Sequence, residues 1–240
     1  MKVLNKLTTT KKKLYALGRL IIWSLSYLRW GGKQYAEFYR MRQDKKALED
    51  PKKAVGGLWE EMGRIQLDFL VSRGLKPEHV LLDVGCGSLR GGLRFIEYLH
   101  PGNYWGIDIS PNILESGRKF VAEKGLESKN PHLLVNNDLK FDELARSTFD
   151  YILAQSVFTH MPEEDIDECF QNLHKILKPS GVFFATFSEG PKKMYHKVVT
   201  RFSYPASLFY QLGEEYGYQV EIDDGFAHPR GLKMLAIRYK

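Results

Sequence analysis

The chain has 240 residues, of which 43% are hydrophobic and 27% are charged, and its formal net charge is +6. This composition is typical of a folded domain of ordinary size, and it excludes a collagen-like, low-complexity or disordered chain. The two cysteines, Cys86 and Cys169, are too few for a disulfide framework or a zinc pattern, so we expect a reducing, cytoplasmic setting.

Positive charge is concentrated near the start of the chain. Residues 1–53 contain 14 Lys and Arg against 4 Asp and Glu, whereas residues 54–240 contain 21 against 25. We therefore divide the chain into a basic helical N-terminal extension, 1–53, and a second region, 54–240. The asymmetry predicts an anionic partner for the extension, either a membrane surface or nucleic acid.

Residues 14–30 place apolar and aromatic side chains at helical spacing. Their uncharged part, 20–28, is far shorter than the roughly 20 residues needed to span a bilayer. One interpretation is that this helix packs on its own domain or on a second copy, so that the N-terminal helices support an oligomer. The other is that residues 11–30 rest on anionic lipid at the inner face of a membrane. Nucleic-acid binding is the least favoured, because no RNA-binding module is visible.

Two more helices, near 34–49 and 58–72, precede an alternation of strands and helices. We predict strands near 80–84, 103–107, 132–136, 149–154, 181–187, 218–223 and 233–239, and helices near 91–99, 112–124, 140–145, 163–176 and 205–216. This order predicts an α/β fold with a seven-stranded, mostly parallel sheet. Since no helix separates the last two strands, we expect the last strand to be antiparallel, at the edge of the sheet.

A glycine turn follows the first of these strands. The sequence Asp83-Val84-Gly85-Cys86-Gly87 sets a carboxylate two residues before two glycines that let the backbone approach a ligand. The dinucleotide fingerprint would need glycine at position 90, where this chain has Arg90. A carboxylate at position 83 would repel a pyrophosphate and suits a cationic amine. The turn therefore indicates a nucleotide site and disfavours a nicotinamide oxidoreductase.

Acidic residues also end the second and third strands. Asp108 follows the glycine turn by about 20 residues, where an acid can accept both hydroxyls of a ribose. Asp138 could accept from the exocyclic amine of adenine, with Ile109 or Leu139 against the ring. Because Asn136-Asn137-Asp138 is also ordinary turn chemistry, a purely structural role for Asp138 stays open.

The fourth strand delivers Gln155, Ser156 and His160 to the same edge, and Leu177-Lys178-Pro179-Ser180-Gly181 comes before the fifth. In this order, the motifs over residues 58–240 resemble the class I S-adenosylmethionine-dependent methyltransferases. The resemblance implies a Rossmann-like fold and S-adenosylmethionine as the cofactor, and we expect no metal site. It assigns Asp83, Gly85 and Gly87 to the methionine end, Asp108 to the ribose, Asp138 and Leu139 to the adenine, and Gln155 to the methionine or sulfonium side.

The residues after the fourth strand bear on the methyl acceptor. Enzymes that methylate amino groups of DNA and some proteins carry Asn/Asp-Pro-Pro-Tyr where this chain has Ala154-Gln155-Ser156-Val157. The segment resembles the branch that acts on small molecules, saccharides and lipids. We therefore expect transfer to a hydroxyl of a small molecule, a sugar or a lipid-linked glycan. His160 is the candidate base for the hydroxyl proton, although it could instead cap the next helix or shape the site.

Two alternatives to this function stay open. The acceptor could be RNA or protein, which the basic extension would serve, or the chain could be a scaffold that binds the cofactor without turnover. Two segments, 186–204 and 228–231, could reach an acceptor or could be mere connections.

Overall fold

The computed structural model describes residues 32–144, 148–196 and 200–240. Residues 40–240 belong to one compact unit that holds the sheet, and the described residues before them, 32–39, belong to another. The candidate interfacial segment 11–30 lies outside the described residues. The extension over residues 1–53 stays a prediction for most of its length, while residues 40–53 belong to the unit that holds the sheet.

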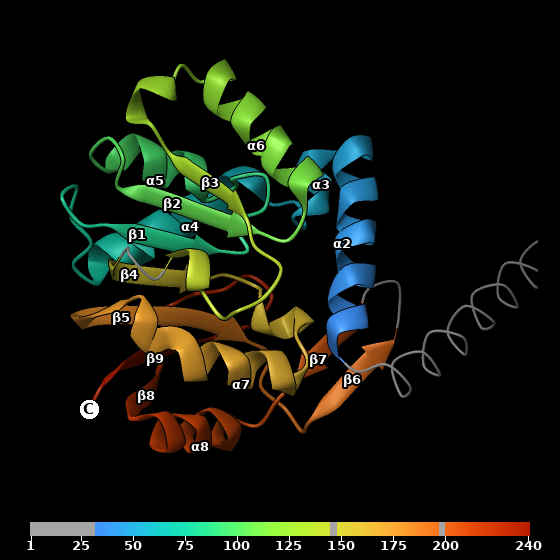
Figure 1. The fold of residues 1–240 in the computed structure, drawn as a ribbon, viewed down its shortest axis with the longest axis vertical. Coiled ribbons are helices and arrows are strands. Elements are labelled where there is room, and N and C mark those ends of the chain that lie inside the picture. Colours follow the sequence, from blue (N-terminus) through green and yellow to red (C-terminus); the bar gives the residue numbers. More distant parts are fainter. Residues whose placement is uncertain (1–31, 145–147, 197–199) are drawn as a thin grey trace, which may run out of the picture. The chain divides into compact units, whose positions relative to one another are not determined.

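A seven-stranded sheet runs through this unit in the order β3-β2-β1-β4-β5-β9-β8 (Figure 1). Neighbouring strands among β1 to β5 pair in parallel, and β9 pairs antiparallel with both β5 and β8. The predicted Rossmann-like α/β fold with an antiparallel last strand is confirmed. The strands are β1 Leu81–Val84, β2 Tyr104–Asp108, β3 His132–Val135, β4 Phe149–Ala154, β5 Leu177–Phe187, β8 Tyr218–Asp223 and β9 Lys233–Tyr239.

The antiparallel strand is not at the edge of the sheet, which corrects the expectation from the sequence. β9 lies between β5 and β8, so β8 is the edge strand. The burial of the two strands explains this order. Met234 to Ile237 are consecutive and buried, as in a strand covered on both faces, whereas Gln219 and Glu221 of β8 are exposed.

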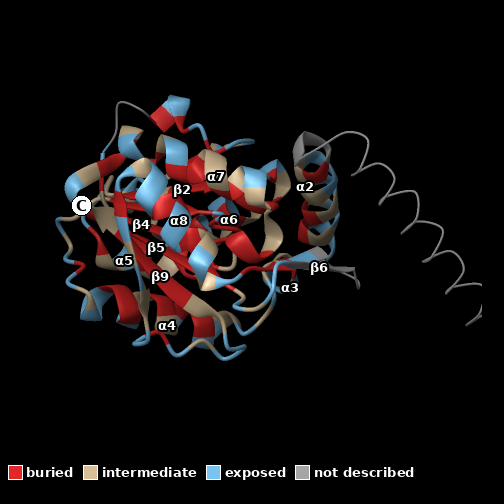
Figure 2. Ribbon diagram, turned by 90° about the horizontal axis from the view of Figure 1, so that it is seen from below, coloured by how far each residue is buried: buried red, intermediate tan, exposed pale blue. Residues whose placement is uncertain are grey.

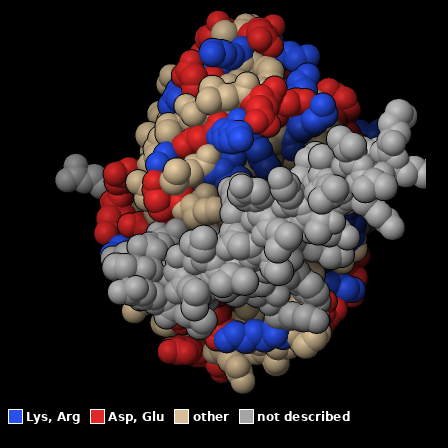
Figure 3. Space-filling model, turned by 90° about the vertical axis from the view of Figure 1, so that its right-hand side faces the viewer, with Lys and Arg blue, Asp and Glu red and all other residues tan. Residues whose placement is uncertain are grey.

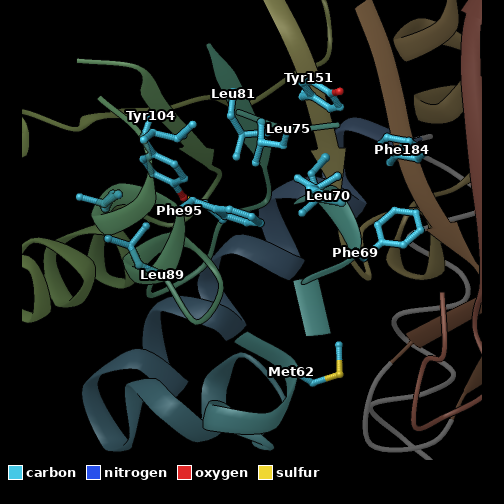
Figure 4. Packing of buried hydrophobic residues seen from close by; sticks show 14 of the residues in the cluster. Met62, Phe69, Leu70, Leu75, Leu81, Leu89, Phe95, Tyr104, Tyr151 and Phe184 are labelled. Atoms are coloured by element: carbon cyan, nitrogen blue, oxygen red, sulfur yellow. The ribbon is translucent and has the colours of Figure 1, made fainter. Parts of the chain in front are cut away.

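Helices cover both faces of the sheet, and the alternation of side chains along the strands separates the two packing layers. Phe184 packs with Phe69 of α4, in a cluster that also takes in Phe95 of α5 (Figure 4). The adjacent Phe183 contacts Phe158, on the side of α8. Figure 2 shows the strands buried between these layers. The helices are α2 Gly32–Glu49, α3 Pro51–Ala54, α4 Trp59–Ser72, α5 Gly92–Tyr98, α6 Pro111–Glu123, α7 Glu163–Asn172 and α8 Ala206–Tyr216.

Two segments differ from the prediction. Among the described residues 140–144 the structure has a short 3-10 turn, Asp142–Leu144, where we predicted a helix over 140–145. Between β5 and α8 it has a hairpin that we did not predict, formed by β6 Lys193–His196 and β7 Thr200–Ser203. Tyr204, the residue directly after β7, donates its hydroxyl to the Met161 carbonyl in the segment after β4, across 2.7 Å.

Candidate functional site

The glycine turn after β1 is held between two other segments. Gly85 and Gly87 have φ angles of +67° and +58°, which disfavour other residues. A Cβ at Gly85 would lie 2.7 Å from Val157 Cγ2, and one at Gly87 would lie 2.4 Å from Val55 Cγ1. Side chains would therefore displace the segment after β4 or the one before α4. The turn brings the backbone to the carboxyl end of the sheet, as predicted.

Asp108 joins this turn to the end of β2. Its Oδ2 accepts from the Gly87 N–H at 3.0 Å, and its Oδ1 accepts from the Ser110 N–H at 2.9 Å. Burial raises the pKa of Asp108 to about 6, against the lowering effect of these two hydrogen bonds. Each carboxylate oxygen can accept a second hydrogen bond. The carboxylate is thus fixed in place with the capacity to accept from a pair of hydroxyls.

Asp44 of α2 reaches the same place, which the sequence did not indicate. The Ser110 hydroxyl donates to Asp44 Oδ1 across 2.5 Å and also caps α6 by accepting from the Ile113 N–H. Arg40 forms an ion pair with Asp44 at 2.7 Å. The charge of Asp44 contributes to raising the pKa of Asp108. No local pattern could have shown this, since 66 residues separate Asp44 from Ser110.

Asp83 is buried at the end of β1. The Tyr104 hydroxyl of β2 donates to its Oδ2 across 2.9 Å. Burial raises the pKa of Asp83 to about 7, and the charge of Asp108 adds to this, whereas Tyr104 and Arg90 oppose it. Asp83 therefore changes its protonation near neutral pH, and an adjacent cation would favour its ionised form.

A strained connection follows β4. Gln155 is 92% buried; its Nε2 donates to Ser156 Oγ, and its Oε1 is buried with no hydrogen-bond partner. Ser156 has a φ angle of +62°, which is rare outside glycine, and its N–H donates to the buried hydroxyl of Thr186 across 2.6 Å. An unpaired buried amide oxygen is costly, so Gln155 is suited to accept from a ligand.

The residues predicted to bind the adenine are Asp138, Leu139 and Ile109. Asp138 follows β3, next to β2; its side chain is exposed and accepts from the Lys140 N–H at 3.1 Å. This is the turn geometry that the sequence analysis kept open. Leu139 is buried and Ile109 is half-buried. The Leu139 N–H donates to Glu168 of α7 at 3.2 Å, a contact that the sequence did not indicate.

His160 ends a short 3-10 turn, Phe158–His160, that follows β4 on the same edge. Its side chain is half-buried. The turn packs against β7, so it lies beside the hairpin between β5 and α8. This places His160 and part of the candidate acceptor segment 186–204 at the edge that carries Gln155.

The described residues also bear on metal binding and on membrane spanning. They contain no group of three or more His, Cys, Asp and Glu side chains arranged to hold a metal ion. None of their helices is both long enough and apolar enough to cross a bilayer. Both cysteines are buried and unpaired.

Residues 82–183 match the family model of a methyltransferase domain. An uncharacterised protein of Rickettsia prowazekii is 31% identical over 111 residues, which are 46% of this chain and 43% of the relative. A probable methyltransferase of Aspergillus luteorubrus is 28% identical over 112 residues, which are 45% of this chain and 39% of the relative. The chain therefore spans less than half the length of these curated relatives.

Solved structures share the fold. One is magnesium protoporphyrin IX methyltransferase from Synechocystis, crystallised with bound SAH. The match covers 85% of this chain and 99% of that chain, with a TM-score of 0.61 and 14% sequence identity. At this identity, the likeness concerns the fold alone. The sheet order defines an α/β protein with polar side chains at the carboxyl edge of its sheet. The segment 82–183 thus matches a methyltransferase domain, and the chain shares the fold of a methyltransferase solved with SAH.

Proposed function

We propose that this protein transfers the methyl group of S-adenosylmethionine to a hydroxyl of a small molecule, a sugar or a lipid-linked glycan. The observation that carries the proposal is the carboxyl edge itself. The fixed carboxylate of Asp108, the close turn at Gly85 and Gly87 and the unpaired oxygen of Gln155 lie on adjacent strands there.

Asp108 is proposed to accept the two ribose hydroxyls. Support comes from the Gly87 and Ser110 N–H groups, each of which holds one of its two carboxylate oxygens in place. Asp138, Leu139 and Ile109 are proposed for the adenine. Leu139 supplies a buried apolar side chain, whereas the bond from Lys140 to Asp138 shows that this carboxylate also has a structural role.

Asp83, Gly85, Gly87 and Gln155 are proposed to bind the methionine end. The ammonium group there can donate to Gln155 Oε1, which satisfies an oxygen that is otherwise buried without a partner. A positive charge close to Asp83 lowers its raised pKa and favours the carboxylate. Both effects favour a ligand with a cationic amine over one with a pyrophosphate.

The cofactor supplies an electrophilic methyl group for in-line displacement, so the protein's task is to position the acceptor and remove its proton. His160 is proposed as the base. As the acceptor oxygen attacks, its proton passes to a neutral imidazole nitrogen, and solvent later removes it. The hairpin next to the His160 turn is proposed to cover the acceptor.

An RNA or protein acceptor is the second candidate. On the face in Figure 3, the described residues intersperse Lys and Arg with Asp and Glu, which differs from the basic stripe expected of a nucleic-acid surface. Three further expectations stay proposals. They are the membrane role of residues 11–30, an oligomer through the N-terminal helices, and a cytoplasmic location at or near the inner face of a membrane. A scaffold without turnover is the third candidate.

Calorimetry and a transfer assay test the proposal in sequence. The full chain is expected to bind S-adenosylmethionine and not NAD; tight NAD binding would contradict the cofactor assignment. Radiolabelled S-adenosylmethionine is then supplied with hydroxylated metabolites, glycans and RNA. Label in a metabolite or glycan supports the proposal, label in RNA supports the second candidate, and binding without any transfer supports the scaffold.

A further inference from the structure

Two arginines from distant parts of the chain hold one turn. Arg90 Nη1 donates to the carbonyl oxygens of Val55 and Gly57, at 2.9 Å each. Arg230, in the connection between β8 and β9, donates to the carbonyl oxygen of Gly56. Three successive carbonyl groups are thus bound by two guanidinium groups, which brings two positive charges to the same turn.

Among the described residues, neither Arg90 nor Arg230 forms an ion pair with a carboxylate. Arg90 is 91% buried and its Nε has no hydrogen-bond partner. Burial lowers the pKa of Arg90 to about 10, and the charge of Arg230 contributes, with Asp83 acting in the opposite direction. Burying a guanidinium next to another cation is unfavourable unless an anion joins them.

His228 adds a third donor at this place. Its Nδ1 accepts from the Arg230 backbone N–H at 3.0 Å. Burial together with the charges of Arg230 and Arg90 lowers the pKa of His228 to about 4, so the ring is neutral at neutral pH. Because Nδ1 is an acceptor, the single ring proton is on Nε2, which can donate to an oxygen.

The cluster of Arg90, Arg230 and His228 adjoins the cofactor turn. Val55, whose carbonyl Arg90 binds, contacts the glycine turn at Gly87. β8 is parallel to β5, because both are antiparallel to β9, so the connection 224–232 is at the carboxyl edge that carries Asp83 and Gln155. Arg230 is exposed and Arg90 is buried, so the cluster extends from the surface to the side of the site.

We propose that Arg90, Arg230 and His228 bind a carboxylate or phosphate of the methyl acceptor, so that the substrate is an acidic molecule. This inference rests on the proposed methyl transfer. Guanidinium groups bind such anions through paired, charge-assisted hydrogen bonds. The amino-acid end of the cofactor also has a carboxylate. Arg90 lies inside the segment 82–183 that matches the methyltransferase domain model, but Arg230, His228 and the turn 55–57 lie outside it, so we assign the site to the acceptor.

Inorganic phosphate is the first probe. It is titrated into the full chain by calorimetry, with and without saturating S-adenosylhomocysteine. We expect phosphate to bind, with an affinity that S-adenosylhomocysteine changes by no more than about twofold. Arg230→Gln should weaken phosphate binding about tenfold or more. Arg238→Gln, which removes an exposed arginine paired with Glu221, is the matched control. It should leave the affinity for phosphate and the affinity for S-adenosylhomocysteine unchanged.

Three outcomes would overturn the proposal. They are no phosphate binding by the unaltered chain, equal binding by Arg230→Gln, and competition between phosphate and S-adenosylhomocysteine, which would assign the site to the cofactor's carboxylate. Failure of S-adenosylhomocysteine to bind at all would instead contradict the proposed function, and the titration without it would still report on the anion site.

The transfer assay supplies a second readout. Acceptors are compared in pairs that differ only by a phosphate or carboxylate group. Arg230→Gln should raise KM for the acidic member about tenfold and leave KM for the neutral member and for S-adenosylmethionine unchanged. An equal effect on both members would mean that Arg230 only supports the turn 55–57, and the proposal would be wrong.

Discussion

Gly87 donates its backbone N–H to the Asp108 carboxylate across 3.0 Å, and this hydrogen bond connects the turn after β1 to the end of β2. The two elements that we predicted to bind opposite ends of one cofactor are therefore held in one geometry. The Ser110 N–H fixes the other carboxylate oxygen. Less ordering should then accompany binding of the ribose.

Asp108→Asn should weaken S-adenosylhomocysteine binding by about 10- to 100-fold. The change removes the charge and replaces one acceptor oxygen with an amide donor, and hydrogen bonds to charged groups contribute about 1.5–3 kcal/mol each. Calorimetry measures the loss. Asp142→Asn is the control, because Asp142 is an exposed carboxylate whose partner is Lys175. Affinity of Asp108→Asn within twofold of the parent would remove Asp108 from the ribose site.

The sheet could be predicted because its strands are marked locally. β1 and β4 are short apolar runs that end in turn or polar residues, and the order of strands and helices then leaves few topologies. The hairpin β6–β7 could not be predicted, since residues 193–203 show no clear alternation and depend on contacts with the turn at Phe158–His160. In the described part of the helix predicted over 140–145, the structure has a 3-10 turn, Asp142–Leu144.

The candidate site could be predicted where its residues directly follow strands in the sequence. Asp83, the glycines and Asp108 stand at fixed distances from strand ends, so the sequence places them at one edge. The supporting contacts are between distant segments, such as Ser110 with Asp44, and have no sequence pattern. The same is true of Arg90, to which the sequence assigned no role and which binds carbonyl groups more than 30 residues away.

Asp83→Asn should remove a specific pH dependence of stability. Burial raises the pKa of Asp83 from 3.8 to about 7. Between these values the folded protein keeps a proton that the unfolded chain has lost. The stabilisation from this group is thus complete below about pH 4 and is lost as the pH rises through about 7, by up to roughly 4 kcal/mol.

Urea denaturation of the cofactor-free protein from about pH 5 to about pH 8 measures this effect. The difference in unfolding free energy between Asp83→Asn and the parent should move in favour of the variant as the pH rises. Asn can still accept from the Tyr104 hydroxyl, so the packing is retained. Asp142→Asn is a suitable control, because Lys175 lowers the pKa of Asp142 and its ionisation lies below this range. Parallel curves for Asp83→Asn and the parent would contradict the prediction.

Gly87→Ala should destabilise the protein more than Gly125→Ala. Both glycines have left-handed φ angles, +58° and +64°, so both substitutions lose about 1–2 kcal/mol from backbone strain. Only Gly87 has a close neighbour, because nothing lies within 4 Å of a Cβ at Gly125. The contact with Val55 should add about 1–3 kcal/mol. Urea denaturation of the two variants measures the difference.

The double variant Gly87→Ala/Val55→Ala separates overpacking from backbone strain. Removing the Val55 methyl groups should recover most of the extra loss, so that the double variant is more stable than the sum of the single variants predicts. Simple additivity would mean that Val55 moves away at little cost, and the turn would then not be confined on that side.

Thr186→Val should reduce catalysis, whereas Thr186→Ser should not. Valine keeps the shape but removes the oxygen that accepts from the Ser156 N–H, which leaves a buried donor unpaired at a cost of about 1–3 kcal/mol. Ser156 can then leave its left-handed conformation and move the neighbouring Gln155. We expect a higher KM for S-adenosylmethionine together with lower stability. An effect on stability alone would restrict Thr186 to a structural role.

His160→Ala should lower methyl transfer to a hydroxyl about 100- to 10,000-fold, the usual contribution of a general base, and leave S-adenosylhomocysteine affinity unchanged. His160 comes five residues after Gln155, in the turn beside the hairpin. The pH–rate profile discriminates this role from a structural one, because only loss of the base removes the acid limb of kcat/KM. The control is His174→Ala, which removes an exposed histidine near the start of β5. Full activity of His160→Ala would show that solvent accepts the proton.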